Sequence, residues 1–254
     1  MQIETKRFTR LLSKNRLCSK NVFSILMLFA LCAVTLAQAN TLEEAKQKLA
    51  EKDYAAAHAI YLSLANQNDA KACYNLGLMY QDGDGVTKNM DEAVKWYTKS
   101  ADLGYKEAQY TLASLVFQRQ TQSISYPQAV TYYEQAAKQG HVKSQLNLGM
   151  LYLRGDVIAQ DMPAAVQWLS LAASNNNSEA QGYLADLYQQ GAGVEQNTVK
   201  AAMWLLLATQ NEDKRFVNRH TKMLNYLAAQ MTDEQKSSAK KLAAQCKNQQ
   251  LKGC

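Results

Sequence analysis

Small, apolar and aromatic side chains recur along this chain at intervals of 36 residues. Four phases of the pattern are occupied by small residues, leucines, large aromatic residues and alanines, respectively. They are Ala72, Ala108, Ser144 and Ala180; Leu76, Leu112, Leu148 and Leu184; Trp96, Tyr132, Trp168 and Trp204; and Ala93, Ala129, Ala165 and Ala201. Self-similarity at this period indicates one supersecondary unit stacked on copies of itself.

Each 36-residue unit predicts two helices joined by a turn. In the unit 70–105, the segment 70–81 places its apolar residues on one helical face. Gly83-Asp84-Gly85 interrupts that helix, because glycine tolerates the positive φ that other residues resist. A second apolar stripe follows over 90–103 and stops at Gly104. We therefore predict an all-α fold, an α-solenoid of antiparallel helix pairs.

Helix-capping residues repeat with the same period. The predicted N-cap positions are Asp53, Asn89, Ser125, Asp161 and Asn197. All five belong to the residue types that accept a hydrogen bond from the first turn of a helix. Pro127 and Pro163 fall just inside the predicted helix starts, where a missing N–H costs nothing.

The motifs at 70–86 (AKACYNLGLMYQDGDGV) and 91–101 (DEAVKWYTKSA) resemble a Sel1-like repeat, a relative of the tetratricopeptide repeat. The resemblance extends over four units, 70–105, 106–141, 142–177 and 178–213. In the unit 106–141, Arg119 and Thr121 replace the loop glycines, so we expect a different inter-helix loop there. Residues 40–69 resemble a shorter tetratricopeptide-like pair. After 213 the sequence period stops, and we expect capping helices over 214–254.

Residues 1–39 are predicted to be a secretory signal. A basic segment precedes the apolar run 22–37, and Ala37-Gln38-Ala39 supplies small residues for cleavage between Ala39 and Asn40. The alternative is an uncleaved membrane anchor. Cleavage would give a periplasmic or secreted protein, and the family resemblance implies a bacterial envelope.

The positive charge of the chain belongs mostly to this leader. The whole sequence carries a formal charge of +6, of which six basic residues and Glu4 in the leader contribute +5. The remainder is close to neutral, so charge gives no support for nucleic-acid binding.

Three cysteines follow the leader: Cys73, Cys246 and Cys254. An exported protein can keep disulfides, and Cys246 and Cys254 are a possible pair that would close a short loop. The resemblance implies a comparison with a cysteine-rich subfamily of Sel1-like proteins, in which the position of Cys73 forms a disulfide with a cysteine eight residues earlier. In this chain that earlier position holds Ala65, so this disulfide is absent. Glutamines occupy the equivalent position in later units, so we expect the Cys73 thiol to touch solvent.

Catalytic and metal-binding patterns are weak in this sequence. Asp82 and Asp84 resemble the opening of a calcium loop, but the later ligands do not match. The histidines lack metal-ligand spacing, and we expect neither a metal nor a cofactor. Ser237-x-x-Lys240 matches the nucleophile motif of penicillin-recognising enzymes without its companion elements. A cell-wall-related serine enzyme therefore stays an alternative hypothesis.

The resemblance to tetratricopeptide stacks implies that the first helix of each pair lines a concave binding face. The residues in phase with that face are Tyr74, Asn75, Leu78, Tyr110, Phe117, Asn147, Met150, Tyr183 and Asp186. Aromatic side chains offer rigid contact area at low entropic cost. The leading hypothesis is an exported, non-enzymatic scaffold that binds a protein or peptide there, with no nucleic-acid partner. It would contact a membrane only through an uncleaved leader.

Overall fold

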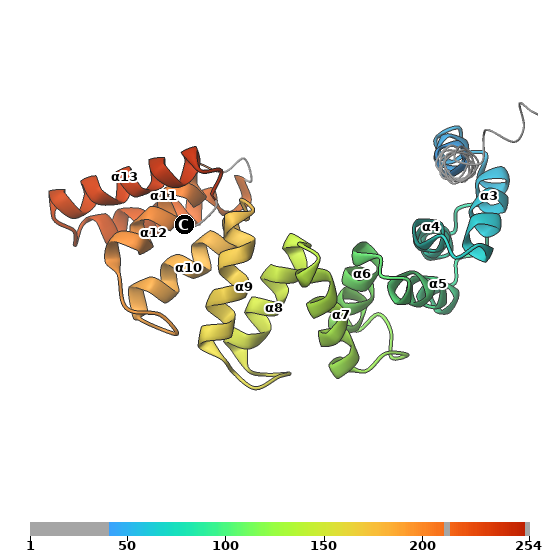
Figure 1. The fold of residues 1–254 in the computed structure, drawn as a ribbon, viewed down its shortest axis with the longest axis horizontal. Helices are drawn as coiled ribbons and strands as arrows, with labels where there is room; N and C mark the ends of the chain where they lie inside the picture. Colours follow the sequence, from blue (N-terminus) through green and yellow to red (C-terminus); the bar gives the residue numbers. More distant parts are fainter. Residues whose placement is uncertain (1–40, 211–213, 252–254) are drawn as a thin grey trace, which may run out of the picture. The chain divides into compact units, whose positions relative to one another are not determined.

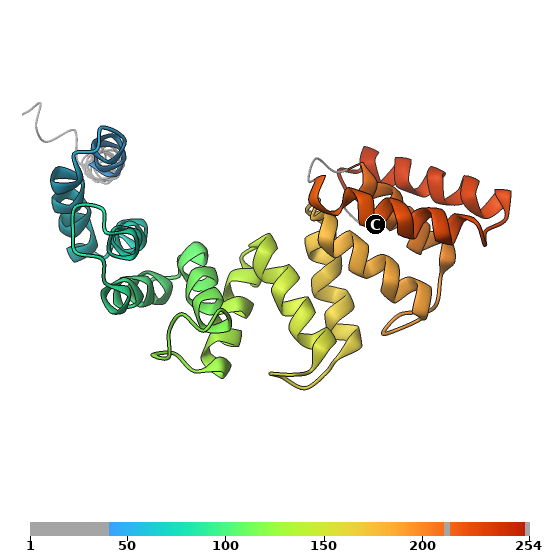
Figure 2. The same ribbon diagram turned by 180° about the vertical axis from the view of Figure 1, so that it is seen from behind.

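The computed structural model describes residues 41–210 and 214–251 of the 254-residue chain, and these contain twelve helices and no strand. A first helix spans 41–50. The others are α3 (Tyr54–Asn66), α4 (Ala70–Asp82), α5 (Met90–Asp102), α6 (Lys106–Phe117), α7 (Tyr126–Lys138), α8 (Val142–Arg154), α9 (Met162–Ser174), α10 (Ser178–Gln190), α11 (Thr198–Thr209), α12 (Lys214–Ala228) and α13 (Asp233–Asn248). Figures 1 and 2 show these helices from opposite sides. The predicted all-α class is confirmed.

The chain divides into two compact units, Met1–Asn89 and Met90–Cys254. In the first unit α3 packs against α4, and in the second each helix from α5 to α11 packs against its neighbour along the chain. Both α12 and α13 pack against α11 (Figure 1).

Within the second unit, the helices keep the 36-residue spacing, to within one residue, beyond the point where the sequence pattern ends. The first helices of successive pairs begin at Lys106, Val142, Ser178 and Lys214. The second helices begin at Tyr126, Met162, Thr198 and Asp233. The helices α12 and α13 therefore occupy the place of one more repeat, although the repeat residues are absent from them.

Four of the predicted N-caps bond the backbone as expected. Asp53, Ser125, Asp161 and Asn197 each accept a hydrogen bond from the backbone N–H three residues on. A second periodic set caps the first helices, and sequence analysis did not identify it: Asp69, His141 and Asn177 bond in the same way. Tyr105 occupies the equivalent position before α6 without a side-chain capping bond.

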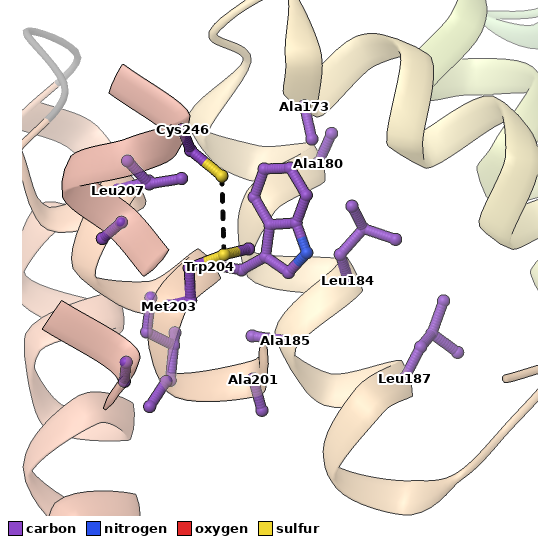
Figure 3. Packing of buried hydrophobic residues seen from close by; sticks show 14 of the residues in the cluster. Ala173, Ala180, Leu184, Ala185, Leu187, Ala201, Met203, Trp204, Leu207 and Cys246 are labelled. Atoms are coloured by element: carbon purple, nitrogen blue, oxygen red, sulfur yellow. Dashed lines mark hydrogen bonds between the residues drawn. The ribbon is translucent and has the colours of Figure 1, made fainter. Parts of the chain in front are cut away.

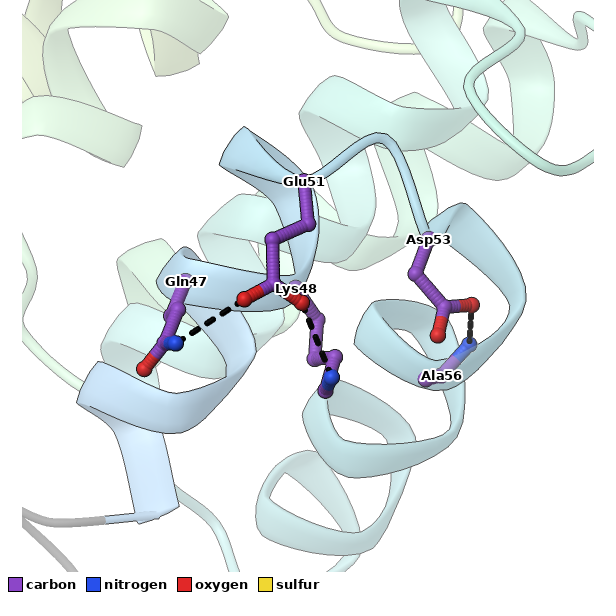
Figure 4. A network of polar contacts seen from close by, with 5 residues as sticks. All are labelled: Gln47, Lys48, Glu51, Asp53 and Ala56. Carbon is purple, nitrogen blue, oxygen red and sulfur yellow. Dashed lines mark hydrogen bonds and ion pairs between the residues drawn. The ribbon is translucent and has the colours of Figure 1, made fainter.

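The helix junction in the first unit is tied by polar contacts at its surface (Figure 4). Glu51 follows the helix 41–50 and accepts hydrogen bonds from Gln47 Nε2 and Lys48 Nζ, both at 2.9 Å. Asp53 then caps α3 through the N–H of Ala56 at 3.2 Å. These exposed contacts fix the turn between two helices, each contributing a few tenths of a kcal/mol by the usual order of magnitude.

The apolar phases of the repeat form the core. The four phase leucines and the alanines of both small-residue phases are fully buried. Trp204 is 1% exposed and lies among Ala180, Leu184 and Ala173 (Figure 3). In the same cluster, the Cys246 Sγ of α13 lies 3.6 Å from the Met203 Sδ of α11. Cys254, the partner expected for Cys246, lies outside the described residues, so that disulfide stays a prediction.

A buried polar link joins consecutive repeats of the second unit. Gln109, Gln145 and Gln181 are at most 3% exposed, and each donates from Nε2 to the carbonyl oxygen eight residues earlier. Donor and acceptor lie 3.1–3.2 Å apart in all three. The bond runs from the first helix of one pair to the end of the preceding helix.

The expectation that Cys73 touches solvent is wrong. Its side chain is fully buried, and its Sγ lies 4.0 Å from the carbonyl oxygen of Ala65. The expectation rests on the assumption that glutamines at the equivalent positions are surface residues. These glutamines point inward because their amides bond the backbone of the preceding helix.

The loop of the unit 106–141 shares one backbone feature with its glycine-containing counterparts. Gly83, Gly155 and Gly191 end their helices with φ between +71° and +86°. Arg119, at the equivalent position, has φ +56°. The left-handed conformation is therefore kept without glycine, at a steric cost of about 1–2 kcal/mol.

Candidate functional site

A cavity of about 410 Å³ lies in the second unit between helices α6, α8 and α10, with α7 behind it. We call it the α6–α10 groove. Five predicted binding residues line it: Tyr110, Phe117, Asn147, Met150 and Tyr183. Ser114 and Leu146 also line it and are in phase with the predicted face, whereas sequence analysis did not select the remaining lining residues: Gln118, Tyr133, Leu151, Arg154 and Glu179. The size falls in the range typical of ligand sites.

Aromatic rings form one wall of the groove. Phe117 and Tyr133 are stacked, with ring centroids 5.4 Å apart and an interplanar angle of 13°. The Tyr110 centroid lies 6.0 Å from that of Tyr133 and 4.5 Å from that of His141. Because each ring packs against another, the wall is held rigid before any ligand arrives.

The hydroxyl of Tyr133 is the polar centre of this wall. It lies 3.1 Å from Ser114 Oγ on α6, and it accepts a hydrogen bond from Asn147 Nδ2 on α8 at 2.9 Å. Burial raises the pKa of Tyr133, so the ring stays neutral at physiological pH. The hydroxyl thereby fixes α6 and α8 relative to α7, and it holds the Asn147 amide in place.

Sequence analysis missed Tyr133 for a specific reason. It lies on the second helix of its pair, in the phase of Tyr97, Leu169 and Leu205, which are buried core residues. That phase predicts packing. Nothing in the sequence distinguishes the one residue whose ring also borders a cavity.

Charged groups gather at the α10 end of the groove. Arg154 ends α8 and is exposed, whereas Glu179 is half-buried in the first turn of α10. Tyr183 lines the same end of the groove, and burial raises its pKa, an effect strengthened by Glu179 and opposed by Arg219 and Arg154. Asp186, one turn further along α10, is half-buried, and desolvation raises the pKa of its carboxyl against the influence of Arg219.

A small crevice adjoins this end and joins α10 to α12. Tyr183 and Glu179 line it together with Gly182, Arg219, His220 and Met223. His220 is 2% exposed and lies directly against Gly182, where a Cβ would collide with the imidazole Nε2. Burial lowers the pKa of His220, which favours the neutral imidazole.

The remaining predicted binding residues belong elsewhere. Asp186 lies on α10 beyond the groove lining, and Tyr74, Asn75 and Leu78 lie half-buried on α4 in the first unit. The Asn75 amide donates to the backbone oxygen of Lys71 at 2.7 Å. A surface shared by these α4 residues and the α6–α10 groove stays a prediction.

The alternative chemistries have the following places in the structure. Ser237, Ser238 and Lys240 are exposed on α13, and Asp82 and Asp84 lie at the turn that ends α4. Within 41–210 and 214–251, no group of three or more His, Cys, Asp or Glu residues could hold a metal ion. The predicted cleavage site at Ala39 and Asn40 lies outside these ranges. Over the same residues, no helix has the length and apolarity needed to cross a bilayer.

Comparison with known proteins gives four successive matches to the family model described as "Sel1 repeat", at residues 70–105, 106–141, 142–177 and 178–213. Together they cover more than half of the chain. A 51-residue stretch is 43% identical to DAP3-binding cell death enhancer 1 of Rattus norvegicus. It spans 20% of this chain and 10% of that protein.

Two solved structures share the fold and part of the sequence. A protective antigen present in uropathogenic Escherichia coli strains, displaying an SLR fold, superposes with a TM-score of 0.69 at 32% identity. The match covers 83% of this chain and 44% of the antigen. A Sel1 repeat protein from Oxalobacter formigenes superposes with a TM-score of 0.60 at 31% identity, over 75% of this chain and 88% of that one.

Proposed function

Because the chain belongs to the Sel1 repeat family, whose repeats generally serve as scaffolds for protein–protein interaction, we propose that it is an exported, non-enzymatic scaffold. In this proposal it binds a peptide segment of another protein in the α6–α10 groove. The partner is a protein, and no cofactor takes part.

The rigid aromatic wall of the groove is the observation that carries the proposal. The helices α6 and α7 of one repeat, α8 of the next and the first turns of α10 of a third repeat line one cavity. They bring apolar rings, an amide and a hydroxyl to it. Aromatic anchors in a preformed groove lose little entropy on binding, which is typical of peptide-recognition surfaces. An exposed aromatic and polar groove also suits an extended segment better than a small molecule that must be enclosed.

Export is the second part of the proposal. The leader composition and the Ala37-Gln38-Ala39 site support it. The similar protein from uropathogenic Escherichia coli is a protective antigen, which fits a location where antibodies reach it. We therefore propose a bacterial envelope location, periplasmic or secreted.

Site-directed photo-crosslinking in the producing cell tests the groove. A benzophenone amino acid is placed at Met150 in the groove and, as matched control, at Leu171, which is 47% exposed on α9. We expect one protein to be crosslinked from position 150 and not from 171. The same product should weaken in a Phe117→Ala variant whose helical circular dichroism is unchanged. Equal crosslinking from both positions would place binding outside the groove.

Mass spectrometry of the isolated protein tests export separately. An N-terminus at Asn40 in a periplasmic or secreted fraction is the expected result. A protein that begins at Met1 and sediments with membranes would instead support the anchored alternative. A cytosolic protein with an intact leader would contradict export in either form.

A further inference from the structure

We infer that the α6–α10 groove selects an internal peptide segment in which an aromatic side chain is followed or preceded, about three residues away, by an acidic side chain. This inference rests on the proposed function and adds the chemistry of the ligand to it. The aromatic side chain would pack on the rings of Phe117 and Tyr110, which the buried ring of Tyr133 supports, and its acidic neighbour would bind Arg154.

The wall favours an aromatic ligand side chain. Phe117 and Tyr133 are stacked at 5.4 Å, and Met150 completes the apolar lining on the α8 side. Aromatic rings and methionine both form favourable contacts with another ring, beyond the gain from buried area alone. The hydroxyl of Tyr133 is already bonded to Ser114 and Asn147. The ring of Phe117 and the side chain of Met150 therefore supply the apolar part of the lining.

Arg154 is the exposed charge of the groove. Among the described residues, no carboxylate lies within ion-pair distance of its guanidinium. Glu179, the acid in the lining, is half-buried and lies in the first turn of α10, where the helix dipole stabilises a negative charge. Arginine presents paired donors that match a carboxylate.

The neighbouring residues reinforce this preference for an anion. Arg219 is exposed in the adjoining crevice and, like Arg154, acts on Tyr183. Asp186 is half-buried, and desolvation opposes its ionisation. Around Tyr183 the guanidinium groups therefore face solvent, whereas the carboxyl groups are partly withdrawn from it.

The spacing follows from helix geometry. Asn147, which bonds Tyr133, and Arg154 lie on α8 seven residues apart. At 1.5 Å per residue this is about 10 Å along the helix. An extended peptide advances about 3.3 Å per residue. The carboxylate therefore lies about three residues from the aromatic side chain.

A peptide series tests the inference with the full-length protein. The probes are unlabelled, N-acetylated, C-amidated decapeptides of Gly and Ser that hold one Trp and one Glu, separated by one to six positions. Isothermal titration calorimetry gives their Kd values. We expect the tightest binding near a separation of three, and a loss of about fivefold when Glu is replaced by Gln.

Substitutions in the protein identify the side chain that binds the glutamate of the peptide. Arg154→Gln should abolish the difference between the Glu and Gln peptides. Lys138→Gln is the matched control, because it removes one exposed positive charge from α7 outside the groove lining. It should leave the difference intact.

The outcomes separate this inference from the proposed function. Trp-dependent binding that is equal for Glu and Gln peptides, or unchanged in Arg154→Gln, overturns the acidic preference and leaves peptide binding standing. A peptide of the same sequence with a free C-terminal carboxylate is measured in parallel, and binding of that peptide without binding of any amidated one overturns the internal segment. If no Trp peptide binds at any separation, both the inference and the peptide-binding groove are wrong.

Discussion

Arg119 holds a backbone conformation that glycine holds in three other repeats. Its φ is +56°, whereas Gly83, Gly155 and Gly191 have φ between +71° and +86°. The same helix lacks a side-chain cap at Tyr105. The pair α6–α7 therefore carries two local weaknesses, and it also supplies the aromatic wall of the groove.

Arg119→Gly is expected to stabilise the protein. Glycine adopts a left-handed conformation without the steric cost that arginine has there, so the free energy of unfolding should rise by about 1 kcal/mol. Urea denaturation measures the change. Gly155→Ala, the opposite substitution in the next repeat, should lower stability, and an unchanged midpoint in Arg119→Gly would show that this backbone carries no strain.

Protonation of His141 should destabilise the fold. Burial lowers its pKa, with Glu107 opposing and Lys106 and Lys143 adding to the effect. Its Nδ1 accepts the Ser144 N–H that caps α8, and the imidazolium cannot accept it. The folded pKa lies below the unfolded value of about 6.5. Stability is therefore complete above that value and declines as pH falls through the folded pKa.

Urea midpoints at pH 5, 6 and 7.5 measure this dependence. His141→Asn keeps a capping acceptor that does not titrate, so its midpoint should change less between pH 7.5 and 5 than that of the native protein. The remaining slope would include His220, whose pKa burial also lowers. Identical slopes for the variant and the native protein would exclude His141 as the source.

Sequence patterns predicted single residues well where local chemistry decides their role. The caps Asp53, Ser125, Asp161 and Asn197 follow from side-chain type and phase alone. Cys73 and Tyr133 could not be placed in this way. The prediction for Cys73 depends on whether the glutamines at equivalent positions point inward or outward, which their residue type does not decide. The role of Tyr133 depends on a hydroxyl bonded across three helices.

At the scale of elements, α12 shows how a helix without the repeat residues can keep the register. It begins 36 residues after α10, and His220 packs where Gly182 leaves room. In the two preceding first helices, the position of Gly182 holds Tyr110 and Leu146, which line the groove instead. Sequence periodicity did not predict this packing. Gly182 lies on α10, which fits the repeat pattern, whereas His220 lies on α12, which does not.

A double-mutant cycle tests the docking of α12 on α10. Gly182→Ala should lower the free energy of unfolding by about 1 kcal/mol, because overpacking against His220 exceeds the helix-propensity gain of alanine. In a His220→Ala background, the same substitution should raise stability by up to about 1 kcal/mol. Thermal unfolding of the four proteins measures both steps. The same sign in both backgrounds would argue against direct contact.

At the scale of the molecule, sequence analysis predicted the class and the number of Sel1 repeats, because a periodic core phase determines both. The division into two units at Asn89 was not predicted, since it falls inside one repeat. The groove was predicted in part. Five of its lining residues follow from phase, whereas Arg154 and Glu179 meet there only through the stacking of consecutive repeats.

Removal of residues 214–254 should destabilise the second unit severely. Met203, Trp204 and Leu205 of α11 are at most 2% exposed in a cluster that includes Leu227, Met231 and Ala243. Exposing several such side chains costs on the order of 5 kcal/mol. We expect dye binding to exposed apolar surface and a broad thermal transition.

Ser237→Ala with Ser238→Ala is the control for this truncation. Both serines are exposed on α13, so stability and peptide binding should stay unchanged. Loss of a penicillin-binding or hydrolytic activity in this variant would instead support the serine-enzyme alternative. A truncated protein that unfolds as sharply as the full chain would show that α12 and α13 do not close the core.

The glutamine bonds between repeats have a consequence for how such a chain can change length. Each Gln side chain reaches a main-chain carbonyl, and every residue possesses one whatever its side chain. A junction built in this way places little demand on the identity of its neighbour. Duplication or exchange of a gene segment encoding 36 residues therefore needs no compensating mutation at the residue that accepts this bond, and only the packed side chains, such as Gly182 against His220, have to match across the junction.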